Sequence, residues 1–558
     1  MSNERPWLEH YPAGVPKEVD LGAYSSINAV LDEAFERFRD RPAFANFGHT
    51  LSYAEVDRLS RQFAGYLSGE LKLARGDRIA IMLPNVLQYP IALFGALRAG
   101  LTVVNTNPMY TARELRHQLS DSGATAIVVL DNFASVLQEV LPETPIRHVI
   151  TTGIGDMLGA IKGALMNAVV KHVKKMVPPY HIDGAVRFGD ALARGWRQST
   201  PRLVLGLDDI AFLQYTGGTT GVAKGAMLTH RNMVANMLQA SLWMGDAIRP
   251  GEEVIITALP LYHIFALTAN CFTFIKSGGL NVLITNPRDM PGFVKELAKT
   301  RFTAITGVNT LFNGLIHAPG FAQLDFSRLR TTLGGGMSVQ RAVAEKWKQM
   351  TGCTLAEAYG LTETSPAVCI NPLDLKEYNG SIGLPVPSTT VCIQDEAGQL
   401  LATGQIGELC VKGPQVMKGY WNRPDETAKV MDGNGWLHTG DIARMDERGY
   451  FFIVDRKKDM ILVSGFNVYP NEIEDVVALH PGVLEVAAVG VPDEKSGEAV
   501  KLFVVRKDPG LTEAELRRHC EENLTGYKRP KTIEFRDSLP KSNVGKILRR
   551  ELRESAAR

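Results

Sequence analysis

The sequence predicts an α/β protein with a large N-terminal domain and a small α+β C-terminal domain. With 558 residues the chain is too long for one hydrophobic core, so at least two domains are expected. Short β-branched runs alternate with amphipathic helical stretches over most of the length. In the last third the pattern changes twice, first to short strands with many Gly and Pro residues and then to a compact mixed module.

The first part of the chain is predicted to form α/β subdomains. Helical periodicity occurs at 112–119 and 339–350. Strand-like runs occur at 79–83 (IAIML), 126–130 (AIVVL), 253–258 (EVIITA) and 303–307 (TAITG). Strands that alternate with helices in this way are typical of largely parallel sheets covered by helices.

The second part, from about 382 to 454, is predicted to be a β-rich subdomain that closes the large domain. It has more Gly, Pro and short strands and fewer helical stretches than the region before it. We therefore assign residues 1–454 to the N-terminal domain. The remaining residues, 455–558, form the C-terminal domain.

The C-terminal part shows two helix starts and two strands. Asn471 with Glu474 resembles a capping box, and so does Thr512 with Glu515. The strands VLEVAAVGV and AVKLFVVRK lie between these helices. The pattern predicts a compact α+β module of a size that can fold independently.

Composition excludes several classes of protein. Lys and Arg number 61 against 60 Asp and Glu, so the net charge of +1 offers no basic excess for nucleic acid. The six cysteines contain no CxxC pair and are predicted to be reduced, mostly buried thiols. The N-terminus has no apolar core of a signal peptide. Two uncharged stretches, 79–97 and 254–275, contain Pro and polar residues that do not fit a membrane span. We expect a cytoplasmic protein without a transmembrane helix.

Residues 157–177 (MLGAIKGALMNAVVKHVKKMV) form a distinct segment. Apolar residues recur at helical spacing, and Lys162, Lys171, His172, Lys174 and Lys175 supply only basic or potentially basic side chains. A basic amphipathic helix of this kind can lie on an anionic membrane surface. The alternative is a surface helix whose apolar side packs on the large domain.

Residues 215–225 (YTGGTTGVAKG) are predicted to hold phosphate. Glycines expose backbone N–H groups, and Thr hydroxyls and Lys224 add donors and charge. The spacing is not that of a Walker A loop, and a Gly-rich stretch alone could also be a flexible linker. The pattern resembles the phosphate-binding signature of the adenylate-forming superfamily, which contains acyl- and aryl-CoA ligases, luciferases and peptide-synthetase adenylation domains.

Other motifs of that superfamily follow in the same order. They are YGLTET at 359–364, NGWLHTGDIARMDERGYFFIVDRKK at 434–458 and PKSNVGKILRR at 540–550. Over almost its whole length the chain resembles bacterial long-chain fatty-acid–CoA ligases, for example in LPLYHIF, GVNTLF and SGFNVYPNEIEDV. The resemblance implies activation of long-chain fatty acids by ATP and Mg²⁺ through an acyl-adenylate, transfer to coenzyme A, and release of AMP and pyrophosphate. It also implies a place in fatty-acid degradation and, often, a homodimer.

The resemblance assigns three catalytic residues. Glu363 matches the Mg²⁺ ligand, with Thr216 beside the metal, although a lone Glu is more often a solvated surface acid. Lys546 matches a mobile lysine that reaches the α-phosphate and the substrate carboxylate, and its alternative role is a solvated surface charge. His263 matches a position that lines the acyl pocket and gates it, although a lone His in an apolar run is more often a packed core residue.

The resemblance also assigns the nucleotide site. Asp441 matches the residue that accepts the ribose hydroxyls, Arg456 also reaches the ribose, and Tyr359 should lie beside adenine. Thr216 and Thr362 match positions that touch phosphate. The complete predicted ATP and AMP site is Tyr215, Thr216, Gly217, Gly218, Thr219, Thr220, Gly221, Lys224, Gly335, Gly336, Tyr359, Gly360, Thr362, Asp441, Ile453 and Arg456.

For the other substrates, Gly334 to Gly336 should form a wall between adenine and the acyl pocket, since Gly permits close approach. The fatty-acid site is predicted at His263, Gly307 and Gly334. Lys458 matches the hinge about which the small domain rotates between the two half-reactions. The coenzyme A site is predicted at Gly465 and Phe466, where the glycine leaves room for pantetheine.

Competing interpretations remain at this stage. Ligases for medium-chain, short-chain or aryl acids share all nucleotide motifs, and pocket depth separates them from a long-chain enzyme. A catalytically inactive fatty-acid-binding protein for membrane uptake should have lost Glu363, Asp441, Arg456 or Lys546, and all four are present. A peripheral contact of 157–177 with the inner membrane stays open as an addition to catalysis.

Overall fold

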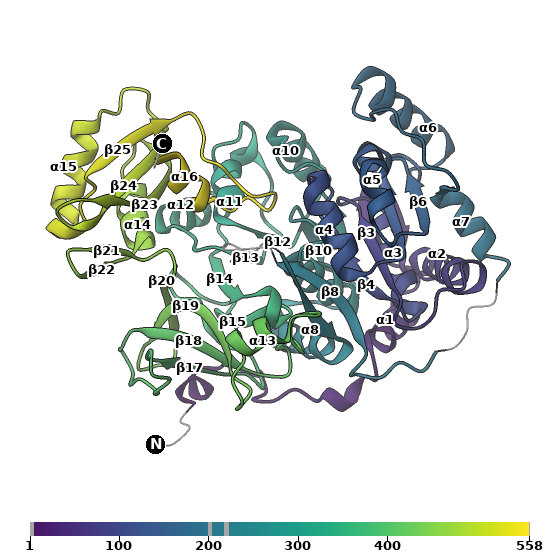
Figure 1. Ribbon diagram of the computed structural model, residues 1–558, viewed down its shortest axis with the longest axis horizontal. Helices are drawn as coiled ribbons and strands as arrows, with labels where there is room; N and C mark the ends of the chain where they lie inside the picture. The colour runs from purple at the N-terminus through teal and green to yellow at the C-terminus, as the bar shows by residue number, and fades with distance from the viewer. Residues whose placement is uncertain (1–4, 199–202, 217–222, 557–558) are drawn as a thin grey trace.

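The computed structural model describes residues 5–198, 203–216 and 223–556. Within these ranges the strands form four sheets, two large ones flanked by helices and two small ones (Figure 1). The large sheets consist mainly of parallel strands, and the last sheet has its own helices and its own apolar core. The predicted α/β class with a small α+β C-terminal unit is confirmed.

The seven-stranded sheet contains the predicted strands IAIML and AIVVL. All its strands are parallel except β9, which pairs antiparallel with β8. In spatial order they are β7 (Val186–Arg187), β6 (His148–Thr152), β5 (Ala126–Leu130), β3 (Arg78–Met82), β4 (Thr102–Asn105), β8 (Ile210–Thr216) and β9 (Lys224–Thr229). The helices that precede or follow these strands in the chain are α2 (Tyr53–Gly65), α3 (Gln88–Arg98), α4 (Ala112–Ser122), α5 (Ala134–Val140), α6 (Ala160–Ala168) and α7 (Phe188–Gly195).

The nine-stranded sheet has a parallel centre and antiparallel edges. Its order is β16 (Leu384–Pro385), β15 (Ala367–Ile370), β14 (Leu355–Gly360), β13 (Thr331–Gly335), β12 (Ala304–Gly307), β10 (Val254–Thr257), β11 (Leu280–Leu283), β1 (Pro42–Asn46) and β2 (His49–Ser52). The associated helices are α1 (Ile27–Arg37), α8 (His230–Met244), the π-helix η8 (Ala266–Phe272), α9 (Thr273–Lys276), α10 (Met290–Ala298), α11 (Asn309–Ile316) and α12 (Arg341–Thr351). One continuous apolar core joins both large sheets, which fixes their relative position.

The β-rich subdomain is a four-stranded antiparallel sheet. Its strands are β17 (Thr390–Gln394), β18 (Gly407–Lys412), β19 (Leu437–Met445) and β20 (Phe451–Arg456), with α13 (Pro424–Val430) between β18 and β19. The strands do not coincide with the predicted range 382–454. β16, at 384–385, belongs to the nine-stranded sheet, whereas β20 continues through Arg456 because it pairs with β19 up to Asp441.

The C-terminal unit contains a five-stranded sheet. Its elements are β21 (Ile461–Val463), β22 (Phe466–Val468), α14 (Pro470–Ala478), β23 (Val483–Asp493), β24 (Gly497–Arg506), α15 (Glu513–Asn523), β25 (Thr532–Arg536) and α16 (Arg549–Ala556). The capping box of Thr512 and Glu515 is confirmed. The one predicted at Asn471 and Glu474 is wrong: α14 begins at Pro470 with Tyr469 as its cap, and the Glu474 carboxylate is bound by Arg549.

The membrane and cysteine predictions can also be compared with the structure. The uncharged stretches are divided between strands, turns and helices, and among the described residues no helix combines the length and apolar character needed to cross a bilayer. All six cysteines are free thiols, and five of them are buried. The predicted helix at 157–177 is shorter in the structure: α6 is followed by a π-helical turn at Val169–Val173, and residues 157–159 and 174–177 are not helical.

Candidate active site

A cavity of about 1070 Å³ lies where the two large sheets, the β-rich subdomain and the C-terminal unit meet. It opens at the C-terminal ends of β8, β13 and β14, at Thr216, Gly335 and Gly360. In α/β sheets this edge is the usual place for ligands, because the loops that follow parallel strands converge there. Asp441 and Arg456 reach it from β19 and β20, and Lys546 reaches it from the C-terminal unit.

The side of the cavity that is predicted to hold the nucleotide, here called the nucleotide side, is built around a carboxylate. The Tyr359 hydroxyl donates to Asp441 Oδ2 at 2.6 Å, and Arg456 Nε lies 3.3 Å from Asp441 Oδ1. Asp441 and Arg456 are cross-strand partners, so sheet register places them together. Burial, with the added negative charge of Asp441, holds the pKa of Tyr359 well above its usual range. The phenol therefore stays neutral and fixes the orientation of the aromatic ring beside a hydrogen-bond acceptor.

Glu363 stands at the phosphate side. It lies in a short 3₁₀ turn after β14, and its Oε1 accepts a hydrogen bond from the Tyr420 hydroxyl at 2.7 Å. Lys224 lies 5.2 Å from the centre of the Tyr420 ring and forms an ion pair with Glu426. These contacts place a carboxylate at the hydroxyl of Tyr420 and a cation over its ring.

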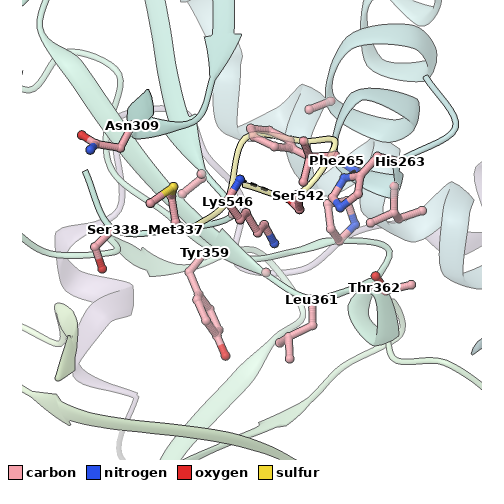
Figure 2. A pocket seen from close by; sticks show the side chains of 18 of the residues that line it. His263, Phe265, Asn309, Met337, Ser338, Tyr359, Leu361, Thr362, Ser542 and Lys546 are labelled. Atoms are coloured by element: carbon pink, nitrogen blue, oxygen red, sulfur yellow. Dashed lines mark hydrogen bonds between the residues drawn. The ribbon is translucent and has the colours of Figure 1, made fainter. Parts of the chain in front are cut away.

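Lys546 enters the cavity on a tight turn. Its backbone N–H donates to Ser542 Oγ at 3.1 Å, and its carbonyl accepts from Ser542 N at 2.7 Å. Figure 2 shows the side chain reaching into the space around Met337, Tyr359 and His263. A β-carbon on Gly336 would lie 3.2 Å from Lys546 Cε, so the glycine gives the lysine room.

Burial lowers the pKa values of two basic side chains in this part of the cavity, Lys546 and His263. Burial lowers the pKa of Lys546 to about 8, and the nearby positive charge of Arg456 lowers it as well. It also lowers the pKa of His263 to about 3, with a contribution from the Lys546 charge. His263 is therefore neutral near pH 7, and its Nδ1 accepts a hydrogen bond from Phe265 N at 3.3 Å. A neutral, held imidazole fits a role in positioning or gating.

A branch of the cavity leads away from Lys546 into the large domain; we call it the acyl branch. One wall is a face of the nine-stranded sheet, and the other is formed by α8 with η8 and α9. Its lining residues are Asn236, Ala240, Trp243, Met244, Ile255, Phe265, Thr268, Ala269, Thr273, Phe274, Ala304, Thr306, Thr331, Leu333, Ala358, Pro366, Ala367, Ile370, Leu373 and Ile382. None of these carries a charge, and polar groups such as Asn236 and Thr268 are hydrogen-bonded within the protein. The branch can accept an apolar chain.

Most predicted site residues come together in this cavity. The lining includes Tyr215, Thr216, Lys224, His263, Gly335, Gly336, Tyr359, Gly360, Thr362, Glu363, Asp441, Ile453, Arg456, Lys458 and Lys546. Five further predicted positions, Gly217, Gly218, Thr219, Thr220 and Gly221, lie outside the described residues.

Two predicted fatty-acid residues do not line the cavity. Side chains alternate along a strand, so Gly335 faces the cavity and Gly334 faces away. A β-carbon on Gly334 would meet Val339 and Leu355, and one on Gly307 would meet Phe312. Both glycines therefore allow close packing behind the wall and are not exposed to a ligand in this arrangement.

The predicted coenzyme A residues also lie outside the cavity. Gly465 and Phe466 belong to the hairpin of β21 and β22. Phe466 is 54% exposed and stacks on Tyr527 with ring centres 4.6 Å apart. Gly465 has φ +83°, and a β-carbon there would meet nothing within 4 Å.

Sequence reasoning missed Glu357 and Tyr420. Glu357 is buried in the lining, its Oε1 accepts from Val339 N at 2.8 Å, and burial raises its pKa to about 8. An acid inside the strand LAEAYG was a signal that could have been noticed, because strands seldom bury Glu without a reason. Tyr420 lies in a loop that is distant from Glu363 in sequence, and no local sequence pattern predicts the hydrogen bond between them.

Comparisons with known proteins agree with this geometry. The pattern of the AMP-binding enzyme family matches residues 31–421, and that of the AMP-binding enzyme C-terminal domain matches 472–546. A long-chain-fatty-acid–CoA ligase of Escherichia coli O157:H7 is 60% identical over 553 residues, which cover 99% of this chain and 98% of that protein. One of Bacillus subtilis (strain 168) is 38% identical over 560 residues, with the same coverage of 99% and 98%.

Solved structures show the same architecture. ATP-bound MatB from Rhodopseudomonas palustris has a TM-score of 0.81 and 30% identity, and the likeness covers 95% of this chain and 99% of that one. The anthranilate CoA ligase AuaEII has a TM-score of 0.85 and 24% identity, with 97% and 99% covered, and it shares the fold.

Proposed function

The chain belongs to the AMP-binding enzyme family, and from that premise we propose that it joins long-chain fatty acids to coenzyme A at the expense of ATP. The observation that favours this activity most is the uncharged acyl branch, which begins at Lys546 beside the carboxylates of the nucleotide side. The similarity to long-chain-fatty-acid–CoA ligases over 99% of the chain supports the same activity. Glu363, Asp441, Arg456 and Lys546 all line one cavity, which argues against an inactive fatty-acid-binding protein.

In the proposed first step, a carboxylate oxygen of the fatty acid attacks the α-phosphorus of ATP. A bond forms between that oxygen and phosphorus, and the bond to pyrophosphate breaks. Both reactants are anionic, so the protein must neutralise charge and align them. Lys546 supplies a positive charge at the point where the acyl branch meets the nucleotide side. Tyr359 provides a flat wall for adenine, and Asp441 accepts the ribose hydroxyls.

Glu363 and Thr216 fit a Mg²⁺ ion at the phosphates. Within the described residues, no three His, Cys, Asp or Glu side chains are grouped to hold a metal by themselves. Mg²⁺ needs only one or two carboxylates when phosphate and water complete its shell, and Glu363 with the Thr216 hydroxyl meets that requirement. When bound, the ion supplies electrostatic stabilisation of the phosphate oxygens.

In the proposed second step, the thiol of coenzyme A attacks the acyl carbon of the adenylate. A carbon–sulfur bond forms, the bond to AMP breaks, and the thiol proton is released. Gly465 and Phe466 lie outside the cavity in the present arrangement, which suits the first step. We infer that the C-terminal unit rotates at Lys458 to bring this hairpin to the site after adenylation.

The length of the acyl branch favours long chains over short or aromatic acids. On β13, Gly335, Leu333 and Thr331 line the branch in succession, so the branch runs for at least four residues of strand, about 13 Å at 3.3 Å each. Acetate or benzoate would leave most of this space empty. The test is acyl-CoA formation across acids from acetate to stearate, with oleate and benzoate. A maximum at long chains is expected, and a maximum at short or aromatic acids would overturn the proposed substrate class.

We also propose that the segment around α6 contacts an anionic membrane surface. Ile161, Leu165, Val173 and Met176 are 88, 65, 74 and 54% exposed, an unusual set for one short segment. Lys171, His172, Lys174 and Lys175 are exposed among them. Apolar side chains next to basic ones match the acyl boundary and headgroups of an anionic bilayer.

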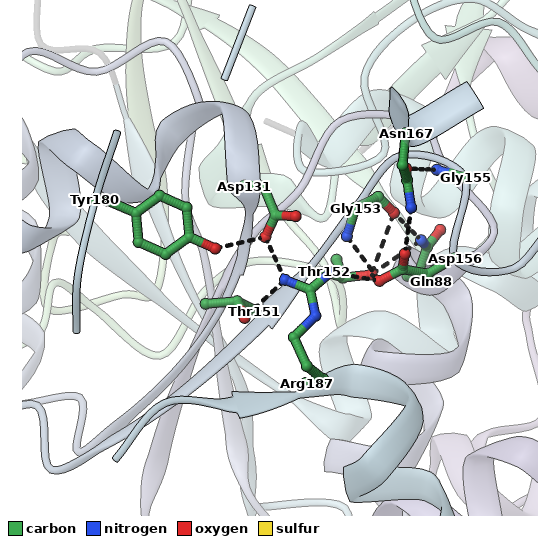
Figure 3. A network of polar contacts seen from close by, with 10 residues as sticks. All are labelled: Gln88, Asp131, Thr151, Thr152, Gly153, Gly155, Asp156, Asn167, Tyr180 and Arg187. Atoms are coloured by element: carbon green, nitrogen blue, oxygen red, sulfur yellow. Dashed lines mark hydrogen bonds and ion pairs between the residues drawn. The ribbon is translucent and has the colours of Figure 1, made fainter. Parts of the chain in front are cut away.

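The underside of α6 is fastened to the domain. Asn167 donates to Asp156 Oδ1 at 2.7 Å and accepts from Gly155 N at 2.8 Å, and Arg187 pairs with Asp156 (Figure 3). A β-carbon on Gly163 would lie 2.3 Å from Gly155 O, so the helix is also packed closely. The network leaves the apolar residues facing outwards on a rigid support.

Co-sedimentation with liposomes tests this contact. Lys171→Gln/Lys174→Gln should reduce binding to vesicles that contain phosphatidylglycerol by about thirtyfold, at roughly 1 kcal/mol for each of the two charges. Lys495→Gln/Lys507→Gln removes two exposed charges elsewhere and should leave binding unchanged. Equal loss in both variants, or none in either, would contradict the contact.

The homodimer implied by the resemblance also stays a proposal. Light scattering of the purified protein tests it by measuring the molar mass in solution.

A further inference from the structure

The loop that carries Lys546 docks on α11 of the large domain through a backbone carbonyl. Thr310, in the first turn of α11, donates from Oγ1 to the carbonyl oxygen of Gly545 at 2.8 Å. Gly545 has φ +84°, and a β-carbon there would lie 2.8 Å from Thr310 Oγ1 and 3.1 Å from Val308 Cγ2. The approach of the loop to α11 therefore requires glycine at 545. In Figure 1 the yellow segment before α16 extends out of the C-terminal unit towards α11.

The contact acts on Lys546 through one rigid group. The carbonyl of Gly545 and the N–H of Lys546 belong to the same planar peptide unit. Thr310 holds the oxygen of this unit from the large domain, and Ser542 Oγ holds its N–H from within the loop at 3.1 Å. The direction in which the Lys546 side chain leaves the backbone is thus set by two hydroxyls, one at each of two opposite edges of the peptide unit.

The base of the loop is fixed to the C-terminal unit. Arg549, three residues after Lys546, donates to Glu474 Oε2 and to Asn471 Oδ1, each at 2.7 Å. Arg553 pairs with Asp459 at 2.6 Å. A loop held in this way follows its domain, so the Thr310–Gly545 bond exists only in the present orientation of the two domains. A second bond from the same helix, from Asn313 Nδ2 to Leu484 O at 2.8 Å, depends on that orientation as well.

We propose that Thr310 is a positioning residue for adenylation: its hydroxyl captures the Gly545–Lys546 peptide and so stabilises the domain orientation in which Lys546 occupies the site. This inference rests on the proposed two-step function. Thr310 touches neither substrate nor reacting atoms, and it is absent from the cavity lining. Its effect should be confined to the first half-reaction, because rotation of the C-terminal unit breaks the bond before the thiol attacks.

Half-reaction kinetics on three variants test the proposal. Thr310→Val removes the hydroxyl and keeps the shape of the side chain, whereas Thr310→Ser keeps the hydroxyl. Thr300→Val removes a hydroxyl that bonds only to Glu296 O in its own helix turn, and it serves as the matched control. Step one is measured as ATP–pyrophosphate exchange with palmitate in the absence of coenzyme A. Step two is measured as palmitoyl-CoA formation from synthetic palmitoyl-adenylate in the absence of ATP.

Thr310→Val should slow step one by about three- to tenfold, the usual worth of one hydrogen bond, and leave step two unchanged or faster. Thr310→Ser and Thr300→Val should resemble the wild type in both steps. Equal slowing of both steps in Thr310→Val would show a general structural role and overturn the proposal, and so would an unchanged step one. Failure of the proposed function looks different, because the wild type itself would then show no exchange with palmitate.

Discussion

A phenylalanine at Ala304 should shorten the acyl branch and convert the enzyme to medium-chain acids. Ala304 is buried in the lining, and it pairs with Thr331 on the neighbouring strand, four residues before Gly335. The part of the acyl branch between Gly335 and the level of Ala304 is therefore about 13 Å long, at 3.3 Å per residue of strand. An extended chain advances about 1.3 Å per methylene, given C–C bonds of about 1.5 Å, so about ten methylenes fit.

The magnitude follows from the part of the chain that is excluded. Palmitate would lose burial of about four methylenes and its terminal methyl, which at about 0.8 kcal/mol each amounts to about 4 kcal/mol. This corresponds to a loss of kcat/KM of about three orders of magnitude for palmitate, at about 1.4 kcal/mol for each factor of ten. Octanoate ends above the block and should be used about as well as by the wild type.

The assay compares kcat/KM for octanoate and palmitate in the wild type, in Ala304→Phe and in a matched control. Ala344→Phe places the same bulk in the core on α12, at a buried residue that does not line the cavity. The control should lose thermal stability through overpacking and keep the wild-type ratio of the two substrates. Equal loss for octanoate and palmitate in Ala304→Phe, or undiminished use of palmitate, would refute the reasoning.

Three further predictions concern the reaction centre. Because burial lowers the pKa of Lys546 to about 8, its charge is present below that pH and lost above it, so kcat/KM for ATP–pyrophosphate exchange should fall as pH rises through about 8. Lys546→Arg stays charged and should abolish that decline, whereas the same decline in the variant would assign it to another group. Gly465→Leu should retain ATP–pyrophosphate exchange and slow transfer from acyl-adenylate to coenzyme A by about a hundredfold. A side chain at 465 meets open space in the present domain orientation, but it would meet pantetheine in the orientation proposed for the second step. Loss of both activities would contradict this assignment. Glu363→Gln keeps an acceptor for the Tyr420 hydroxyl but removes the negative charge. The rate of ATP–pyrophosphate exchange should therefore fall about a hundredfold, and a higher Mg²⁺ concentration should be needed for half-maximal rate. An unchanged Mg²⁺ titration would argue against a metal role for Glu363.

The residues predicted for the nucleotide lie together in the structure, because short motifs place each of them at a turn or strand end. Lys546, Glu363 and Asp441 lie far apart in the chain, yet each sits in a pattern that specifies a turn or strand end, and the structure places all three in one cavity. Strand periodicity likewise located β3 and β5 to within one residue at each end.

The sequence-based predictions were wrong at positions whose role depends on tertiary contacts. Asn471 and Glu474 have the spacing of a capping box, but Arg549 takes both side chains into a network that also includes Asp455. Gly334 and Gly335 look alike in sequence, and only the register of β13 shows which one faces the cavity. The acyl branch is not visible in sequence at all, because its walls come from strands and helices whose separate faces are ordinary apolar patterns.

The most direct test of the central claim follows oxygen from the fatty acid. Palmitate labelled with ¹⁸O in its carboxylate is converted with ATP, Mg²⁺ and coenzyme A, and the nucleotide and phosphate products are analysed by mass spectrometry. If the carboxylate attacks the α-phosphorus and coenzyme A then displaces AMP, one ¹⁸O atom must appear in AMP and none in pyrophosphate. Label in orthophosphate together with ADP, or AMP without label, would contradict an acyl-adenylate and with it the proposed roles of Lys546, Glu363 and Asp441.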